Sequence, residues 1–184
     1  MRNQAASLVF VSLFAALTAV GAFLKIPIPH VPFTLQTLMV MFAGLTLGSR
    51  RGAASQILYI VVGLMGIPVF AQGGGPAYVL QPSFGFLLGF IAGAYVIGKV
   101  AESAQELTVF RAIIALAAGQ AAIYAFGLSY LYLNLNFILH KDVSIWTAIK
   151  IGLLVFLPGD LLKIAVAAAV ALPARNRLPS RIRG

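Results

Sequence analysis

Apolar residues run through this sequence in long stretches, which are separated by short loops rich in polar residues, glycine and proline. Most of these stretches approach or exceed the roughly 17–25 residues that a helix needs to cross a bilayer. They predict six spanning helices, at residues 5–24, 34–47, 52–67, 84–101, 107–133 and 145–172. The second is short, so we expect it either to be tightly packed or to cross where the membrane is locally thin. The expected fold is an all-α integral membrane bundle of six transmembrane helices.

Composition places the chain in the same class. Its 184 residues are 61% hydrophobic and only 9% charged, and the mean hydropathy is +0.99. In a typical soluble domain, about a quarter of the residues are charged. We therefore expect one multi-pass domain over residues 1–184, in the cell membrane. The absence of cysteine excludes disulfides and cysteine-based metal or redox sites.

Lysines and arginines are distributed unevenly between the two sides of the predicted bundle. Cytoplasmic loops of membrane proteins carry an excess of these residues, so both termini are predicted to be cytoplasmic, with a basic tail at residues 173–184. The net charge of +9 is then a topology signal that attracts anionic lipid, and nucleic acid is not an expected partner. The other side holds Lys25 and Lys141, and the last helix holds Lys150 and Lys163. The side of the termini holds nine: Arg2, Arg50, Arg51, Lys99, Arg111, Arg175, Arg177, Arg181 and Arg183.

Two charges lie near the middle of the last apolar stretch, Asp160 and Lys163. On a helix they share one face about one turn apart. The preceding Pro158-Gly159 weakens the helix just before them. Charges at this depth are costly, and they normally pair, face a bundle interior or bind a ligand. Asp160 and Lys163 are therefore either an ion pair that fixes helix packing or part of a ligand site.

The outer loops supply further candidate ligand groups. Thr34 and Gln36 stand at the mouth of the second helix, where they either cap it or reach a ligand. Tyr78 and Gln81 follow three consecutive glycines and offer hydrogen bonds from a pliable outer gate. Aromatic walls complete the expected pocket, which suits a small, partly apolar ligand with amide-type donors and a carboxylate. The aromatic candidates are Phe33 and Phe84.

The residues exclude most catalytic chemistry inside the membrane. Asp160 is the only acid within a predicted span, and His30 and His140 stand singly in outer loops. An aspartyl dyad, a zinc site and a serine with a buried histidine base are therefore not expected. No phosphate-binding Gly-Lys-Ser/Thr motif follows the triple glycine, so the chain itself should not hydrolyse ATP. We expect no catalytic residue, no metal and no cofactor, although proton-coupled transport through Asp160 remains possible.

Small side chains gather on one face of the first predicted helix. Ala15 and Ala19 are four residues apart and Ala22 follows three residues later. In lipid, such a face marks close approach by another helix. That helix belongs either to this chain or to another subunit.

Several blocks of this sequence resemble the BioY family. They run from Val31-Pro32-Phe33-Thr34-Leu35-Gln36 to the final Pro158-Gly159-Asp160-x-x-Lys163. Between them stand Ala43-Gly44-x-x-x-Gly48-x-Arg50-Arg51-Gly52, Gly63-x-x-Gly66-x-Pro68-Val69-Phe70 and Pro82-x-x-Gly85-Phe86-x-x-Gly89-Phe90. BioY proteins are the biotin-binding S components of energy-coupling factor (ECF) transporters.

This resemblance implies a six-helix S-component fold, capture of biotin from outside, and contact of Asp160 and Lys163 with biotin. It also implies a partner, the ECF module, made of one transmembrane coupling protein and two ATPase subunits. Ala15 and Ala19 match the family's Ala-x-x-x-Ala docking signature. One departure is the outer loop Gly73-Gly74-Gly75-Pro76-Ala77. The alternative hypothesis is a structural or solitary facilitator membrane protein, in which Asp160 and Lys163 form a packing pair or a proton relay.

Overall fold

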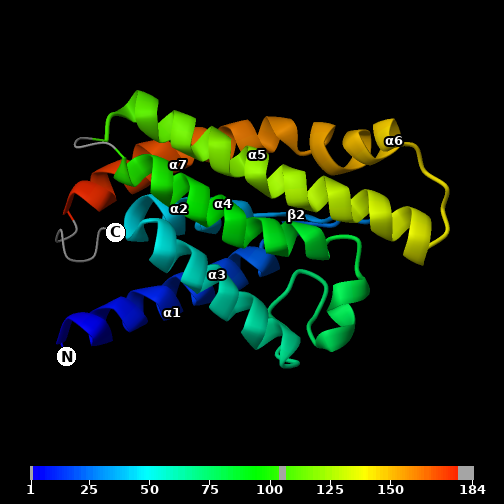
Figure 1. Ribbon diagram of the computed structural model, residues 1–184, viewed down its shortest axis with the longest axis horizontal. Helices are drawn as coiled ribbons and strands as arrows, with labels where there is room; N and C mark the ends of the chain where they lie inside the picture. Colours follow the sequence, from blue (N-terminus) through cyan, green and yellow to red (C-terminus); the bar gives the residue numbers. More distant parts are fainter. Residues whose placement is uncertain (1, 104–106, 178–184) are drawn as a thin grey trace.

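The computed structural model describes residues 2–103 and 107–177, and it is helical apart from one short ribbon (Figure 1). The predicted all-α membrane fold is confirmed. Its elements in chain order are α1 (Arg2–Phe23), β1 (Lys25–Ile26), β2 (Phe33–Thr34), α2 (Gln36–Leu47), α3 (Ser49–Leu64), the 3₁₀ turn η1 (Pro76–Leu80), α4 (Phe84–Glu102), α5 (Val109–Leu133), the π-helical η2 (Asn134–Ile138), α6 (Ile145–Ile149), the π-helical η3 (Lys150–Leu154) and α7 (Leu157–Arg177).

Each of the six predicted spans contains helix, but the spans differ in length. Within the described residues, α1, α4 and the continuous α5–η2 helix are long and apolar enough to cross a membrane. The short second span is an apolar helix of 12 residues, as its sequence predicted. The predicted span 145–172 is not one straight helix. It is broken into α6–η3 and α7, which meet at an angle of 40°.

The break in the last span lies at residues 155–156, just before the proline that weakens the helix. Pro158 occupies the first turn of α7, where its missing amide donor has no intrahelical partner to lose. Asp160 also lies in this first turn, and a negative charge there is stabilised by the unpaired amides of a helix N-terminus. The backbone therefore restarts in a conformation that favours the buried carboxylate.

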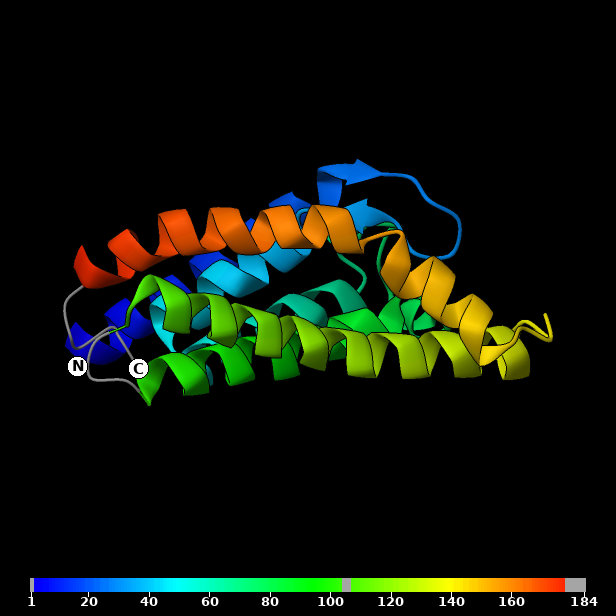
Figure 2. The same ribbon diagram turned by 90° about the horizontal axis from the view of Figure 1, so that it is seen from above.

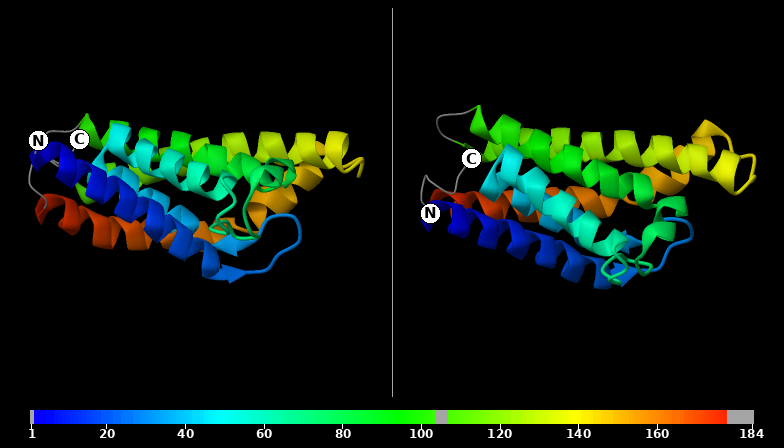
Figure 3. Two further views of the ribbon diagram at one scale, coloured as in Figure 1. Left: turned by 90° about the horizontal axis from the view of Figure 1, so that it is seen from below. Right: turned by 60° about the horizontal axis from the view of Figure 1, so that its bottom comes forward.

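Helices α4 and α5 lie antiparallel along the bundle, and glycines on α4 let them approach closely (Figures 1 and 3). A Cβ added at Gly89 would come within 2.7 Å of the Ile123 carbonyl oxygen, and one at Gly93 within 2.6 Å of the Ile123 side chain. A Cβ added at Gly85 would likewise collide with the side chain of Tyr130 on α5. These glycines, spaced four residues apart, thus form a close-packing face toward α5.

Buried polar side chains tie together the half of the bundle that carries both termini. Glu102 at the end of α4 accepts hydrogen bonds from the backbone N–H and hydroxyl of Ser49, at 2.5 and 2.8 Å. Arg175 of α7 is buried and donates to the carbonyls of Leu45 and Ala101, at 2.8 and 3.3 Å. These carbonyls belong to the last turns of α2 and α4, which lack intrahelical donors.

The beginning of the predicted basic tail is helical. The tail was expected to begin at residue 173, but α7 continues to Arg177, so its first residues are helical. The remaining tail, residues 178–184, lies outside the described residues. The start of α1 and the end of α7 lie at the same end of the bundle (Figure 2).

The two loops that were predicted to face outward, the outer loops, cover the opposite end of the bundle. The proline-rich loop after α1 is held as an antiparallel ribbon, in which Lys25 pairs with Thr34 and Ile26 with Phe33. The Lys25 ammonium donates to the carbonyl of Ala71 in the loop that follows α3. The first loop thus folds back toward the bundle, and its Val31 is buried.

Candidate ligand-binding site

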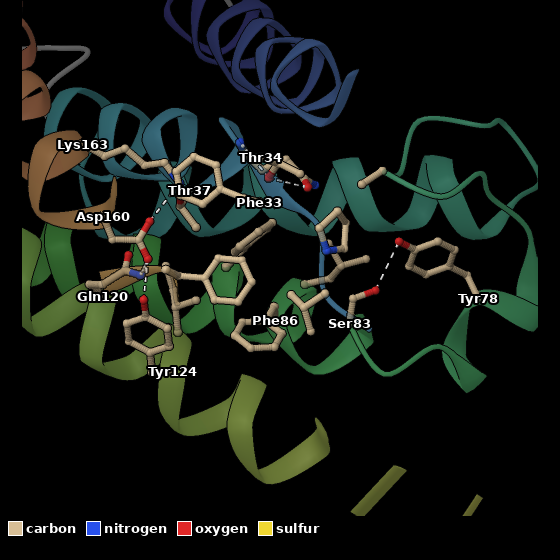
Figure 4. A pocket seen from close by; sticks show the side chains of 18 residues that line it. Phe33, Thr34, Thr37, Tyr78, Ser83, Phe86, Gln120, Tyr124, Asp160 and Lys163 are labelled. Atoms are coloured by element: carbon tan, nitrogen blue, oxygen red, sulfur yellow. Dashed lines mark hydrogen bonds and ion pairs between the residues drawn. The ribbon is translucent and has the colours of Figure 1, made fainter. Parts of the chain in front are cut away.

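A cavity lies beneath the two outer loops and reaches inward to the charged pair of α7 (Figure 4). The space free of protein atoms, its opening included, is about 540 Å³. Its walls come from the first outer loop, α2, η1, α4, α5 and α7, through the residues Val31, Pro32, Phe33, Thr34, Gln36, Thr37, Ala71, Tyr78, Ser83, Phe86, Leu87, Phe90, Gln120, Ile123, Tyr124, Phe156, Asp160 and Lys163.

Asp160 and Lys163 form a buried ion pair at one end of this cavity. The Lys163 ammonium donates to Asp160 Oδ1 at 2.8 Å, and the two residues are 6% and 4% exposed. Asp160 Oδ2 accepts two further hydrogen bonds from α5, one from Gln120 Nε2 at 2.8 Å and one from the Tyr124 hydroxyl at 2.5 Å. The carboxylate is therefore bonded on both oxygens, as a buried charge requires.

Lys163 is held from the side of α2 and the first outer loop as well. It donates to the hydroxyl of Thr37 at 2.8 Å and lies 4.0 Å from the centroid of the Phe33 ring. Phe33 itself stacks on Phe156 with an interplanar angle of 9°. A Cβ at Gly159 would collide with the Phe33 ring, so the glycine of the Pro-Gly pair makes room for it. The outer loop thus packs directly on the beginning of α7.

Hydroxyl groups form a second polar region, nearer the outer loops. Tyr78 and Ser83 approach each other at 3.4 Å, and Thr34 donates to Gln36 Oε1 at 3.0 Å. Gln36 in turn donates to the hydroxyl of Tyr59 at 2.7 Å. Burial raises the pKa of Tyr78 in its loop, so its phenol stays protonated and able to donate. Figure 4 shows this region and the Asp160 region separated by the rings of Phe33 and Phe86.

Six of the eight predicted ligand residues line the cavity, and two do not. Gln81 is exposed at the end of η1, and Phe84 is buried against the ring of Tyr130, at 5.9 Å between centroids. The chain leaves the 3₁₀ turn in an extended conformation at Gln81, so Ser83, two residues later, faces the cavity instead. The six that line it are Phe33, Thr34, Gln36, Tyr78, Asp160 and Lys163.

The sequence prediction missed the contribution of α5 to the site. Gln120 and Tyr124 are four residues apart in an apolar helix, so they share one face. A buried phenol needs a hydrogen-bond partner, which was the available signal for Tyr124. Its partner is Asp160, 36 residues further along the chain.

The proposed docking residues pack mainly within this chain. Ala15 is buried in the hydrophobic core, and Ala19 is partly buried against the same core. At Ala15, the face is therefore covered by this chain itself, which was one of the two alternatives. Docking of a partner at these residues stays a prediction.

Comparison with known proteins agrees with this architecture. A biotin transporter BioY of Thermotoga maritima is 41% identical over 166 residues, which cover 90% of this chain and 93% of the relative. A probable biotin transporter BioY of Lysinibacillus sphaericus is 47% identical over 164 residues, 89% of this chain and 83% of the relative. A crystal structure of the S-component for biotin from an ECF-type ABC transporter superposes with a TM-score of 0.85 at 24% identity, covering 99% of this chain and 97% of the other. That structure shares the fold. The sequence model of the BioY family matches residues 1–180, and this chain belongs to that family.

Proposed function

We propose that this protein is a membrane-embedded subunit that binds biotin from outside the cell and delivers it inward. It is a transport subunit rather than an enzyme. Relatives that align over most of the chain are named biotin transporters. The observation that carries the proposal is the cavity, whose two polar regions are separated by aromatic side chains. Biotin has a matching distribution of polar groups, because an apolar chain joins its cyclic urea to its carboxylate.

The position of the ion pair favours a ligand site over a packing pair. Asp160 and Lys163 both line the cavity, and Lys163 also touches Thr37 and Phe33 of its wall. A pair that served packing alone would be enclosed between helices. The structural alternative therefore explains the pair's burial but not the space beside it.

Binding by the purified protein tests the proposal. In detergent, the protein should bind one biotin per chain with high affinity, and Lys163→Ala should weaken binding at least about tenfold, which corresponds to about 1.4 kcal/mol. Lys150→Ala is the matched control, because Lys150 is an exposed lysine of the same broken span and does not line the cavity. Failure of the parent protein to bind biotin would contradict the proposal.

We further propose that transport requires an ECF module, with one transmembrane coupling protein and two ATPase subunits, and that both termini are cytoplasmic. Support comes from the excess of basic residues at the end of the bundle that carries both termini. Anionic lipid is the expected neighbour of these residues.

The docking surface can be tested at α1. Ala19→Trp should preserve biotin binding and abolish co-purification with the module, because a large side chain holds the helices apart. Ala15→Trp is less informative, since Ala15 belongs to the chain's own core. Ile114→Trp, on the exposed face of α5, is the control. If Ala19→Trp still assembles and transports, docking uses another surface.

A further inference from the structure

Gln120 presents an unpaired acceptor beside the charged pair. Its side chain is 5% exposed and lines the cavity from α5. Its Nε2 donates to Asp160 at 2.8 Å, but among the described residues its Oε1 has no hydrogen-bond donor. Buried carbonyl oxygens are usually bonded. An unpaired oxygen on a cavity wall therefore indicates a donor that arrives with a ligand.

The direction of this amide follows from its neighbour. An ionised carboxylate only accepts hydrogen bonds, so the NH₂ group of Gln120 must face Asp160. The opposite orientation would bring two acceptor oxygens to 2.8 Å from each other. Asp160 therefore orients Gln120 so that Oε1 points away from the carboxylate.

Asp160 itself is a weaker candidate for the same donor. Its Oδ2 already accepts from Gln120 and Tyr124, and its Oδ1 accepts from Lys163. Of the side-chain oxygens of Asp160 and Gln120, only Gln120 Oε1 accepts no hydrogen bond from the described residues. The better candidate acceptor for a ligand donor is therefore the partner of Asp160 on α5, Gln120.

We propose that Gln120 Oε1 accepts a hydrogen bond from a ring N–H of the ligand's cyclic urea and selects for that donor. This inference rests on the proposed function, because it takes biotin as the ligand. The urea then lies against α5 and α7, and the carboxylate extends toward the hydroxyls of Tyr78 and Ser83 (Figure 4). The charges agree with this direction, because the positive charge of Lys163 is already matched by Asp160 and is not left to pair with a carboxylate.

The experiment compares biotin with two carbamate analogues, in which one or the other ring N–H is replaced by oxygen. Each replacement removes one donor with little change in size. The parent protein should bind one of the two analogues at least about tenfold more weakly than biotin. In Gln120→Met, which keeps the length of the side chain but accepts no comparable bond, biotin and that analogue should bind within about threefold of each other.

Gln56→Met is the matched control. Gln56 is also a buried glutamine, but it bonds to Thr18 and Ser55 away from the cavity. This variant should keep the parent's preference for biotin over the analogue.

The outcomes separate the two proposals. If the parent binds biotin but Gln120→Met keeps the parent's preference, a bound water satisfies Oε1 and the inference is overturned, whereas the proposed function stands. Should Gln120→Met not fold, the parent decides: equal affinity for biotin and both analogues overturns the inference, and discrimination against one supports it. A parent that binds no biotin overturns the proposed function, and the inference with it.

Discussion

Replacing Asp160 by asparagine removes one charge of the buried pair while it keeps the size of the side chain. Lys163 then retains the Thr37 hydroxyl and the Phe33 ring in a site where it is 6% exposed. Loss of one partner from a buried ion pair costs about 3–5 kcal/mol. The ammonium still contacts Thr37 and Phe33, so we expect destabilisation at the lower end of this range, about 3 kcal/mol. For a chain of this size, that lowers the unfolding midpoint by roughly 6–12 °C.

A double-mutant cycle isolates the interaction from other effects of the substitution. Lys163→Met removes the second charge and keeps an unbranched apolar stem. The double variant Asp160→Asn/Lys163→Met leaves no unmatched charge. Its loss of unfolding free energy should therefore be about 2 kcal/mol smaller than the sum of the losses in the two single variants. Thermal unfolding in detergent, followed by the fluorescence of the single tryptophan Trp146, measures the three variants against the parent.

Two results would refute this reasoning. One is an Asp160→Asn variant within about 0.5 kcal/mol of the parent, the range of an ordinary surface substitution. The other is strict additivity in the cycle, which would show that the two charges do not stabilise each other. Biotin binding is measured separately on the same proteins. Asp160→Asn should lower the affinity for biotin at least about tenfold, and an unchanged affinity in a folded variant would exclude Asp160 from the site.

Three further predictions concern the bundle itself. Single cysteines placed in this cysteine-free chain at Ser103 and at Lys141 should be labelled from the cytoplasmic and the outer side respectively, and outside labelling of the Ser103 variant would reverse the topology. Gly89→Val should lower stability by about 1–3 kcal/mol or more, because its side chain meets the Ile123 carbonyl, whereas Ala92→Val at a partly exposed site of α4 should have little effect on the unfolding midpoint. Arg175→Ala should raise amide hydrogen exchange at the C-terminal ends of α2 and α4, since it removes hydrogen bonds to Leu45 and Ala101; exchange equal to the parent's would show that water replaces them.

The features that sequence predicted best depend on local geometry. Asp160 and Lys163 are three residues apart, so any helix places them on one face, and they meet at 2.8 Å. The glycines of α4 repeat every four residues, which predicts a close helix contact whatever the partner is. The identity of that partner, α5, was not contained in the spacing.

The features that sequence missed depend on contacts between distant segments. Gln120 bonds to Asp160 across 40 residues, and the bond exists only because α5 packs beside α7. Lys163 reaches Thr37 across 126 residues. A polar residue in an apolar helix indicates a need for a partner, but helix packing decides which partner it finds.

The prediction that Gln81 lines the cavity was wrong for a different reason. Tyr78 and Gln81 are three residues apart, and within a 3₁₀ helix residues at this spacing lie on one side. Tyr78 lies inside η1, but Gln81 has the extended backbone angles φ −78° and ψ 139°, so the helical spacing ends before it. A loop pattern therefore predicts a side chain's direction only as far as the regular backbone extends.

The Pro158-Gly159 pair shows how a local signal acquires a use from the fold. Its weakening effect predicts a break near these residues, and the structure places the break just before them. Proline then lies in the first turn of α7, and glycine provides the space that the Phe33 ring fills. Because Phe33 also lies under the Lys163 ammonium, the outer loop, the break and the ion pair form one contact. Since the cavity is lined by this loop and by α7, a ligand that fills it would contact both parts of this arrangement.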